Sequence, residues 1–157
     1  MYLVIIKSQK EIYKRLGRRI EALELLPGVY LTWSPREKIE KAVETTKREL
    51  TREWEEKGEG PFFDTAIIEL TEGQTKSLKT LSRAVIESLA EAMLVEMERL
   101  HTRLRSRDKK AVGWYRDLAR RYKKLIDTSF VLDIYPSILD KLKEKWMEIS
   151  LEAGRLR

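Results

Sequence analysis

The segment Tyr2-Leu3-Val4-Ile5-Ile6 opens the part of the chain that decides the fold. It is a continuous apolar run rich in β-branched residues, which is typical of a strand buried on both faces. The next apolar residues lie mostly four apart, the spacing of a helix that packs inward on one side: Ile12, Leu16, Ile20 and Leu23. Gly17 lies inside this helix and costs it about 1 kcal/mol relative to alanine. We therefore expect Gly17 to mark a close approach of the helix to a sheet.

Turn and cap signals extend this pattern to about residue 71. Pro27-Gly28 separates two apolar runs and predicts a tight turn between strands, because proline fixes φ at one corner and glycine permits positive φ at the next. Ser34 is the expected cap of a second helix, with proline at the first helical position and Glu37 at the capping-box position. This helix ends near residues 57–61, and Thr65 to Leu70 is the last expected strand.

The resulting order is strand, helix, strand, strand, helix, strand. It predicts an α+β fold of the ferredoxin-like βαββαβ type, with both helices on one face of an antiparallel sheet. The remainder is helical: a long helix capped at Thr71 or Thr75, a break at residues 106–110, a second helix and a third after Tyr135. Their apolar seams have coiled-coil spacing and predict an antiparallel hairpin followed by a C-terminal helix. We therefore predict a ferredoxin-like domain at residues 1–71 and a helical extension at residues 72–157.

The composition excludes several classes of protein. The chain has 157 residues, of which 42% are hydrophobic and 37% charged, so it holds a packed core and an unusually charged surface. It has no cysteine, which excludes disulfides, thiolate metal sites and cysteine nucleophiles, and a single histidine, His101, which excludes sites with two imidazoles. The apolar runs are too short for a membrane span, and the first residues do not resemble a secretion signal. We expect a cytoplasmic protein without membrane partner, metal or cofactor.

The net charge of +6 is unevenly distributed along the chain. Residues 1–20 hold six basic side chains and one acidic one, residues 101–125 hold ten and two, and residues 21–100 hold 11 and 17. Clustered cations predict a footprint for nucleic-acid phosphates. The candidate ligands are Lys7, Lys14, Arg15, Arg18 and Arg19 in the first basic block and Arg103, Arg105, Lys109, Lys110, Arg120 and Lys124 in the second. The alternative is a surface of ion pairs in a thermostable protein.

Two other side chains stand out in the second block. Trp114 lies one step off the apolar seam, so it either stacks on a base or packs against the third helix. His101 lies beside Arg103 and is expected to be a polar surface residue, with phosphate contact as the alternative.

Enzymatic signals are sparse. The chain contains no Gly-rich phosphate loop, no His-Glu-x-x-His helix and no Gly-x-Ser-x-Gly elbow, so we expect no catalytic residues. A metal-dependent nuclease is the minor alternative and would need Asp64, Glu69 and Glu72 to assemble in space.

The order of elements, with Gly28-Val29-Tyr30-Leu31-Thr32-Trp33-Ser34-Pro35 and Leu70-Thr71-Glu72-Gly73-Gln74, resembles the amino-terminal domain of the ChrB-type chromate-resistance regulators over residues 2 to 127. The resemblance implies a regulator that binds DNA. The carboxy-terminal domain that the family associates with chromate has no counterpart in the sequence, so we do not expect chromate sensing. The first half is also similar to the CRISPR spacer-acquisition nucleases, but Ile6-Lys7-Ser8-Gln9 lacks the aspartate that holds their metal.

Two main hypotheses follow. The first is a non-catalytic regulator or nucleic-acid-binding protein that contacts phosphates through basic helices. The second is a structural or oligomeric interaction module, such as a homodimer, in which the third helix or a second subunit covers the free face of the sheet.

Overall fold

The computed structural model describes residues 1–156 and divides the chain into two compact units. The first unit is Met1–Lys79 and the second begins at Thr80. The division falls eight residues beyond the predicted one at residue 71, because the short helix α3 (Glu72–Ser77) belongs to the first unit. Thr71 and Gln74 form a capping box at the start of α3, and the long helix α4 begins only at Lys79.

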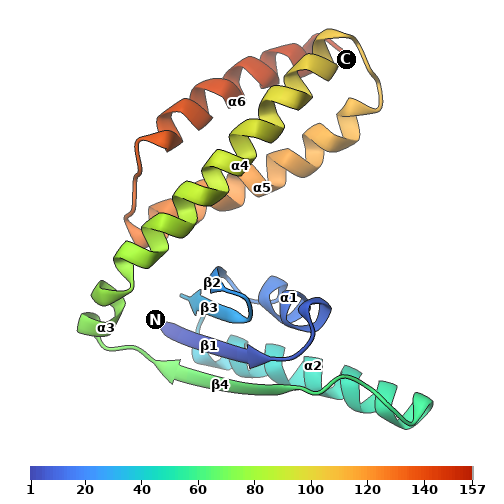
Figure 1. Cartoon of the computed structure of the whole chain (residues 1–157), viewed down its shortest axis with the longest axis vertical. Helices are drawn as coiled ribbons and strands as arrows, with labels where there is room; N and C mark the ends of the chain where they lie inside the picture. The colour runs from blue at the N-terminus through green and yellow to red at the C-terminus, as the bar shows by residue number, and fades with distance from the viewer. Residues whose placement is uncertain (157) are drawn as a thin grey trace. The chain divides into compact units, whose positions relative to one another are not determined.

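The first unit contains a four-stranded antiparallel sheet (Figure 1). Its strands are β1 (Tyr2–Lys7), β2 (Ala22–Leu26), β3 (Val29–Thr32) and β4 (Asp64–Glu69), in the spatial order β2-β3-β1-β4. In the register, Val4 of the central strand β1 lies opposite Tyr30 and Ile67. The predicted α+β class with an antiparallel sheet is therefore confirmed.

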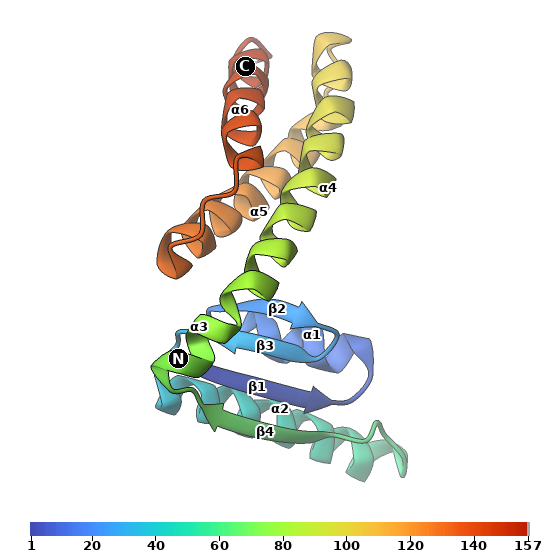
Figure 2. The ribbon, with the colours of Figure 1, turned by 60° about the vertical axis from the view of Figure 1, so that its left-hand side comes forward.

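Helices α1 (Lys10–Arg18) and α2 (Arg36–Lys57) lie against one face of this sheet (Figure 2). The core between them includes Val4 and Ile6 of β1, Leu16 of α1 and Ile39 of α2. These side chains come from one side of β1 and from the inward faces of both helices, as the sequence spacing predicted.

Two local predictions had opposite outcomes. A Cβ atom on Gly17 would lie 2.5 Å from the ring of Tyr30, so the expected close approach of α1 to the sheet is confirmed. The expected cap at Ser34 is wrong. The N-cap of α2 is Pro35, without a side-chain hydrogen bond, and the Ser34 hydroxyl instead accepts from the backbone N–H of Glu21 at 2.8 Å.

The second unit consists of α4 (Lys79–Arg105), α5 (Ala111–Leu132) and α6 (Ile138–Gly154). Trp146 of α6 stacks between two tyrosines of α5, at 5.1 Å from the Tyr115 ring and 4.9 Å from the Tyr122 ring. Polar contacts join α4 to both other helices, so each helix touches the other two. Among the described residues, no helix combines the length and apolar character that a membrane crossing requires.

Candidate nucleic-acid interface

The first basic block is largely paired with carboxylates of its own unit. Lys14 lies 2.8 Å from Glu24, and Arg19 and Arg15 lie 2.5 and 3.4 Å from Glu49. The hydrogen bond from Arg19 holds the pKa of the Glu49 carboxyl below its ordinary value, which shows how closely the charges match. Three of the five predicted phosphate ligands of this block are thus already paired with acids, although Arg15 and Arg19 share the single carboxylate of Glu49.

The other two predicted ligands of the first block lie apart from these pairs. Lys7 lies at the end of β1, and its Nζ sits 5.7 Å from the centre of the exposed Phe62 ring. Arg18 is exposed in the last turn of α1. The unpaired predicted ligands of the first block therefore lie on different elements, β1 and α1.

The second basic block is different, because most of its cations are exposed and unpaired. Among the described residues, no carboxylate lies within ion-pair distance of Arg105, the last residue of α4. The same is true of six cations in the turn before α5 and in α5 itself: Lys109, Lys110, Arg116, Arg120, Lys123 and Lys124. Arg116 and Lys123 were not among the predicted ligands. Their spacing from Arg120 could have identified them, since residues three or four apart share one side of a helix.

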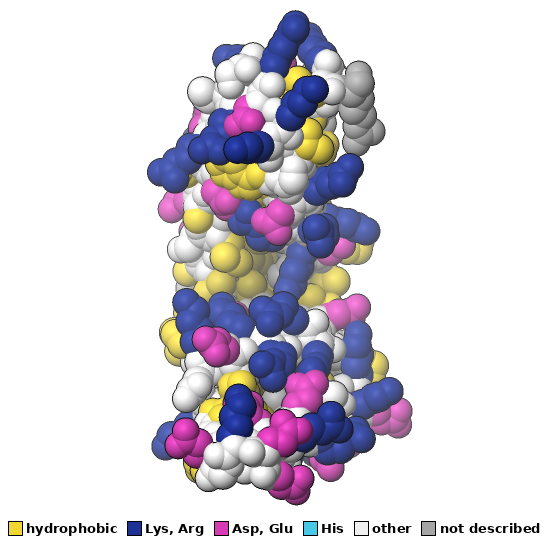
Figure 3. All heavy atoms as spheres, turned by 90° about the vertical axis from the view of Figure 1, so that its right-hand side faces the viewer, with side chains coloured by type: hydrophobic (Ala, Val, Ile, Leu, Met, Phe, Trp, Pro, Cys, Tyr) yellow, Lys and Arg dark blue, Asp and Glu magenta, His cyan; other side chains and the backbone are white. Residues whose placement is uncertain are grey.

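The six cations of this turn and of α5 form what we call the cationic face. From Lys110 to Lys124 the helix axis advances about 21 Å, at about 1.5 Å per residue. Two of the nearby acids serve other groups, since Asp108 accepts from the Lys110 backbone N–H at 2.9 Å and Asp117 accepts from Arg121 at 3.0 Å. A third acid, Asp127, is exposed one turn after Lys123. Figure 3 shows Lys and Arg more frequent than Asp and Glu where α4 to α6 lie.

Arg121 and Trp114 fasten α5 to α4 through Glu96. Arg121 donates to both Glu96 carboxylate oxygens, at 2.5 and 2.9 Å, and the Trp114 indole N–H donates to the same carboxylate at 3.2 Å. The hydrogen bond from Arg121 lowers the pKa of the Glu96 carboxyl, and that from Trp114 adds to the effect. The guanidinium of Arg103 lies 5.5 Å from the centre of the Trp114 ring.

This arrangement places Trp114 against α4, where neither sequence interpretation expected it. The aromatic residue that packs between α5 and α6 is Trp146. Arg103 remains exposed, but its guanidinium already lies beside an aromatic ring. We therefore count neither Trp114 nor Arg103 in the cationic face.

Gly113 lies on the exposed side of α5 between Lys110 and Arg116. A Cβ atom built there would meet nothing within 4 Å, so packing does not require glycine at this position. Glycine in a helix interior costs about 0.5 to 1 kcal/mol relative to alanine, but it leaves the helix backbone open to close approach. A phosphate backbone could therefore approach the helix closely at this point.

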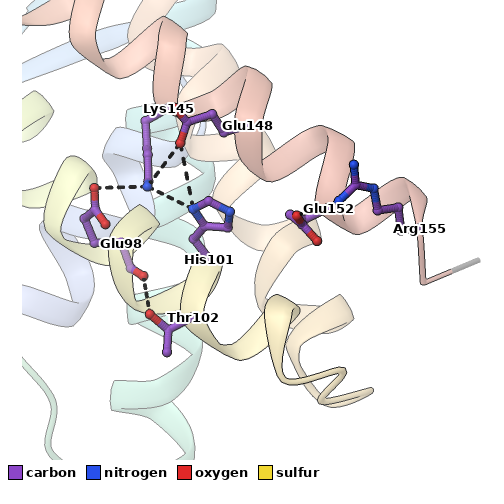
Figure 4. A network of polar contacts seen from close by, with 7 residues as sticks. All are labelled: Glu98, His101, Thr102, Lys145, Glu148, Glu152 and Arg155. Atoms are coloured by element: carbon purple, nitrogen blue, oxygen red, sulfur yellow. Dashed lines mark hydrogen bonds and ion pairs between the residues drawn. The ribbon is translucent and has the colours of Figure 1, made fainter.

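His101 is buried, with 4% of its surface exposed, so the prediction of a polar surface residue is wrong. Its Nδ1 atom accepts from Lys145 of α6, whose Nζ lies 2.9 Å away (Figure 4). The same ammonium group lies 3.1 Å from Glu98 and 3.3 Å from Glu148. His101 thus joins α4 to α6 and does not contribute to a phosphate site.

The burial of His101 beside Lys145 predicts that the folded protein is less stable at acidic pH. Burial, and then the charges of Lys145 and Arg105, lower the pKa of His101 below its ordinary value, although Glu148 and Glu152 oppose this shift. The unfolded chain therefore takes up a proton before the folded one, and stability contributed by neutral His101 is lost as the pH falls below about 6.5. We expect a lower melting temperature at about pH 5 than at pH 7 by differential scanning calorimetry.

The control is His101→Leu, which removes the only imidazole. The variant should show a smaller loss between these two pH values. An equal loss in both proteins would mean that carboxylates alone cause the acid sensitivity.

The acidic residues of the nuclease alternative do not form a shared site. Asp64 and Glu69 are the two ends of β4, about 17 Å apart along an extended strand, which is too far for one ion. In the part of the chain that the structure describes, no group of three or more acidic or histidine side chains could hold a metal.

Comparisons of the chain with protein-family models, curated proteins and solved structures give no match. The contacts and charges of the residues therefore carry the assignment of function.

Proposed function

We propose that the protein is a non-catalytic nucleic-acid-binding protein of the regulatory kind, and that its cationic face binds the phosphates of a duplex. The observation that carries the proposal is a row of exposed arginines and lysines without carboxylate partners along one side of α5. A protein that only stabilised itself by surface ion pairs would pair these cations, as Lys14, Arg15 and Arg19 of the first basic block are paired.

The electrostatic gain on binding is large for such a row. Duplex DNA carries about one negative charge per 1.7 Å of axis, and each neutralised phosphate releases condensed counterions. A face about 21 Å long spans about six base-pair steps, so several of its cations can reach phosphates at once. Lysine and arginine contacts of this kind position a protein on DNA and read little sequence.

A duplex suits this face better than a single strand. Proteins that bind single strands combine cations with free aromatic rings on which bases stack. Trp114 is hydrogen-bonded to Glu96 and has Arg103 beside its ring, and the exposed ring of Phe130 lies about 9 Å along the helix axis beyond Lys124. We therefore expect weaker binding of a single strand of the same length.

The first unit supports a more specific assignment of the fold. Its order of elements is that of a split βαβ unit, with β1 between β3 and β4 and both helices on one face. We propose a ferredoxin-like fold on this basis, and with it the similarity to the ChrB-type amino-terminal domain and a cytoplasmic location.

A salt titration tests the proposed function. Fluorescence anisotropy of a labelled duplex should give an affinity that falls about 10³-fold or more between about 50 mM and 200 mM salt, because six or more phosphate contacts are involved. Binding that is independent of salt, or absent at micromolar protein, would contradict the proposal.

Self-association is the second candidate function. On the sheet face opposite α1 and α2, Ile5 and Ile68 are 38% and 41% exposed, and a second copy would cover them. Light scattering at low and high salt tests this: a monomer under both conditions would exclude it.

A further inference from the structure

Strand β4 has one unpaired edge. It pairs with β1, and no other described strand lies along its far side. The backbone N–H of Leu70 donates to the carbonyl oxygen of Met1 at 2.9 Å. This bond shows that Leu70 and every second residue before it in β4 direct their backbone groups toward β1. Because every second residue of an antiparallel strand faces its neighbour, Thr65 and Ile67 direct their N–H and C=O groups outward. Accordingly, the Thr65 N–H donates to the adjacent Asp64 carboxylate at 2.9 Å.

The middle of this edge lacks the usual protection against strand addition, although the Asp64 carboxylate already accepts from the Thr65 N–H. Natural edge strands are guarded by proline, lysine, bulges or inward-pointing charges. The other edge strand, β2, has a register shift between Glu24 and Leu26. In contrast, β4 pairs with β1 without interruption, and its central residues Thr65 to Ile68 carry no charge.

The charges at its two ends select the occupant. Asp64 and Glu69 are both exposed and both acidic. The alternation of outward-facing residues shifts an antiparallel second copy of β4 by one residue from matched register, so that Asp64 faces Ile68 or Leu70 and no cation faces either acid. A strand with lysine or arginine at its ends would instead form ion pairs at both positions.

Two exposed aromatic rings lie beside the Asp64 end of the strand. Phe62 is 62% exposed and Trp54 is 46% exposed. Hydrogen bonds fix the backbone next to both rings. The Ser8 hydroxyl donates to the Phe62 carbonyl oxygen at 2.7 Å, and the Trp54 indole N–H donates to the Pro61 carbonyl oxygen at 3.2 Å. Aromatic faces attract cations, and Lys7 already lies over Phe62. A basic side chain that extends past Asp64 would meet these rings.

We propose that β4 is the docking edge for an extended basic segment of a partner protein, which adds to the sheet as a fifth strand. The backbone edge supplies main-chain hydrogen bonds, and the acids and aromatic rings supply the preference for basic side chains. The interaction does not involve the cationic face, so it is independent of the proposed nucleic-acid binding.

Two blocked peptides on the full chain test the proposal: Lys-Thr-Val-Thr-Val-Lys and its analogue with glutamate at both ends. Titration followed by amide NMR shifts should show binding of the lysine peptide centred on β4, about tenfold tighter than that of the glutamate peptide. Equal binding of both peptides, no binding at millimolar peptide, or shifts centred elsewhere would overturn the proposal.

Two variants complete the test. Thr65→Pro removes an outward N–H and leaves the bonds to β1 in place, so it should abolish peptide binding. The double variant Asp64→Lys/Glu69→Lys keeps every backbone group and should reverse the preference toward the glutamate peptide. An unchanged preference in the double variant would overturn the proposal even if Thr65→Pro did not fold.

Discussion

An affinity loss of about 10³-fold for duplex DNA is expected at about 0.1 M salt when the four exposed cations of α5 are changed to glutamine. These are Arg116, Arg120, Lys123 and Lys124. Each removed phosphate contact should also reduce the slope of log affinity against log salt by about one. Anisotropy titrations at several salt concentrations measure both quantities. The fold should persist, because all four side chains are exposed and none forms an ion pair among the described residues.

A matched control separates the cationic face from net charge. Glutamine at four exposed cations of α2 changes the charge of the protein by the same amount: Lys38, Lys41, Lys47 and Arg48. Because these cations are not among the proposed phosphate contacts, this variant should lose less than about tenfold in affinity. Similar losses in both variants would mean that binding follows net charge alone.

The strands and turns of the first unit could be predicted because their signals are local. The apolar run Tyr2–Ile6 and the Pro27-Gly28 turn depend on neighbouring residues, and Gly28 indeed has a φ of 78°. Ser34 misled the prediction because its hydroxyl binds the backbone of Glu21, which is distant in sequence. A capping pattern cannot show that another element of the fold already occupies the side chain.

The buried side of α4 differs from the predicted one for a related reason. In the sequence, the apolar residues of this helix recur three or four apart, a spacing that predicts a seam through Leu81 and Leu89, but both side chains are exposed. The structure buries the adjacent Ser82 and Ala90 together with Ile86. Small side chains allow helices to approach each other closely. A search for a repeating pattern of large apolar residues does not detect them.

The candidate site was only partly visible in the sequence. The charge count identified the second basic block in the chain, but it could not distinguish free cations from paired ones. Arg19 meets Glu49 across 30 residues, and Arg121 meets Glu96 across 25. His101 and Lys145 are 44 residues apart. Such pairings depend on how helices pack, and no local pattern records them.

Gly17→Ala should destabilise the protein by about 1 to 3 kcal/mol, the usual cost of overpacking a core. The new methyl group would lie 2.5 Å from Cζ of Tyr30. That ring cannot move aside easily, because it is buried and its hydroxyl lies 2.7 Å from the Glu24 carboxylate and 3.2 Å from the Tyr13 carbonyl oxygen. Burial, aided by the Glu24 carboxylate, raises the pKa of Tyr30, so the phenol stays neutral and keeps these contacts.

Gly113→Ala is the control with the same chemical change in open space. It should stabilise the protein by about 0.5 to 1 kcal/mol, because alanine favours the helix and its Cβ atom meets nothing within 4 Å. Urea unfolding of both variants measures the two free energies. Helix propensity favours alanine at both sites, so a loss confined to Gly17→Ala isolates the contact with Tyr30. Stabilisation by both substitutions would show that α1 does not pack on the sheet as closely as the structure indicates.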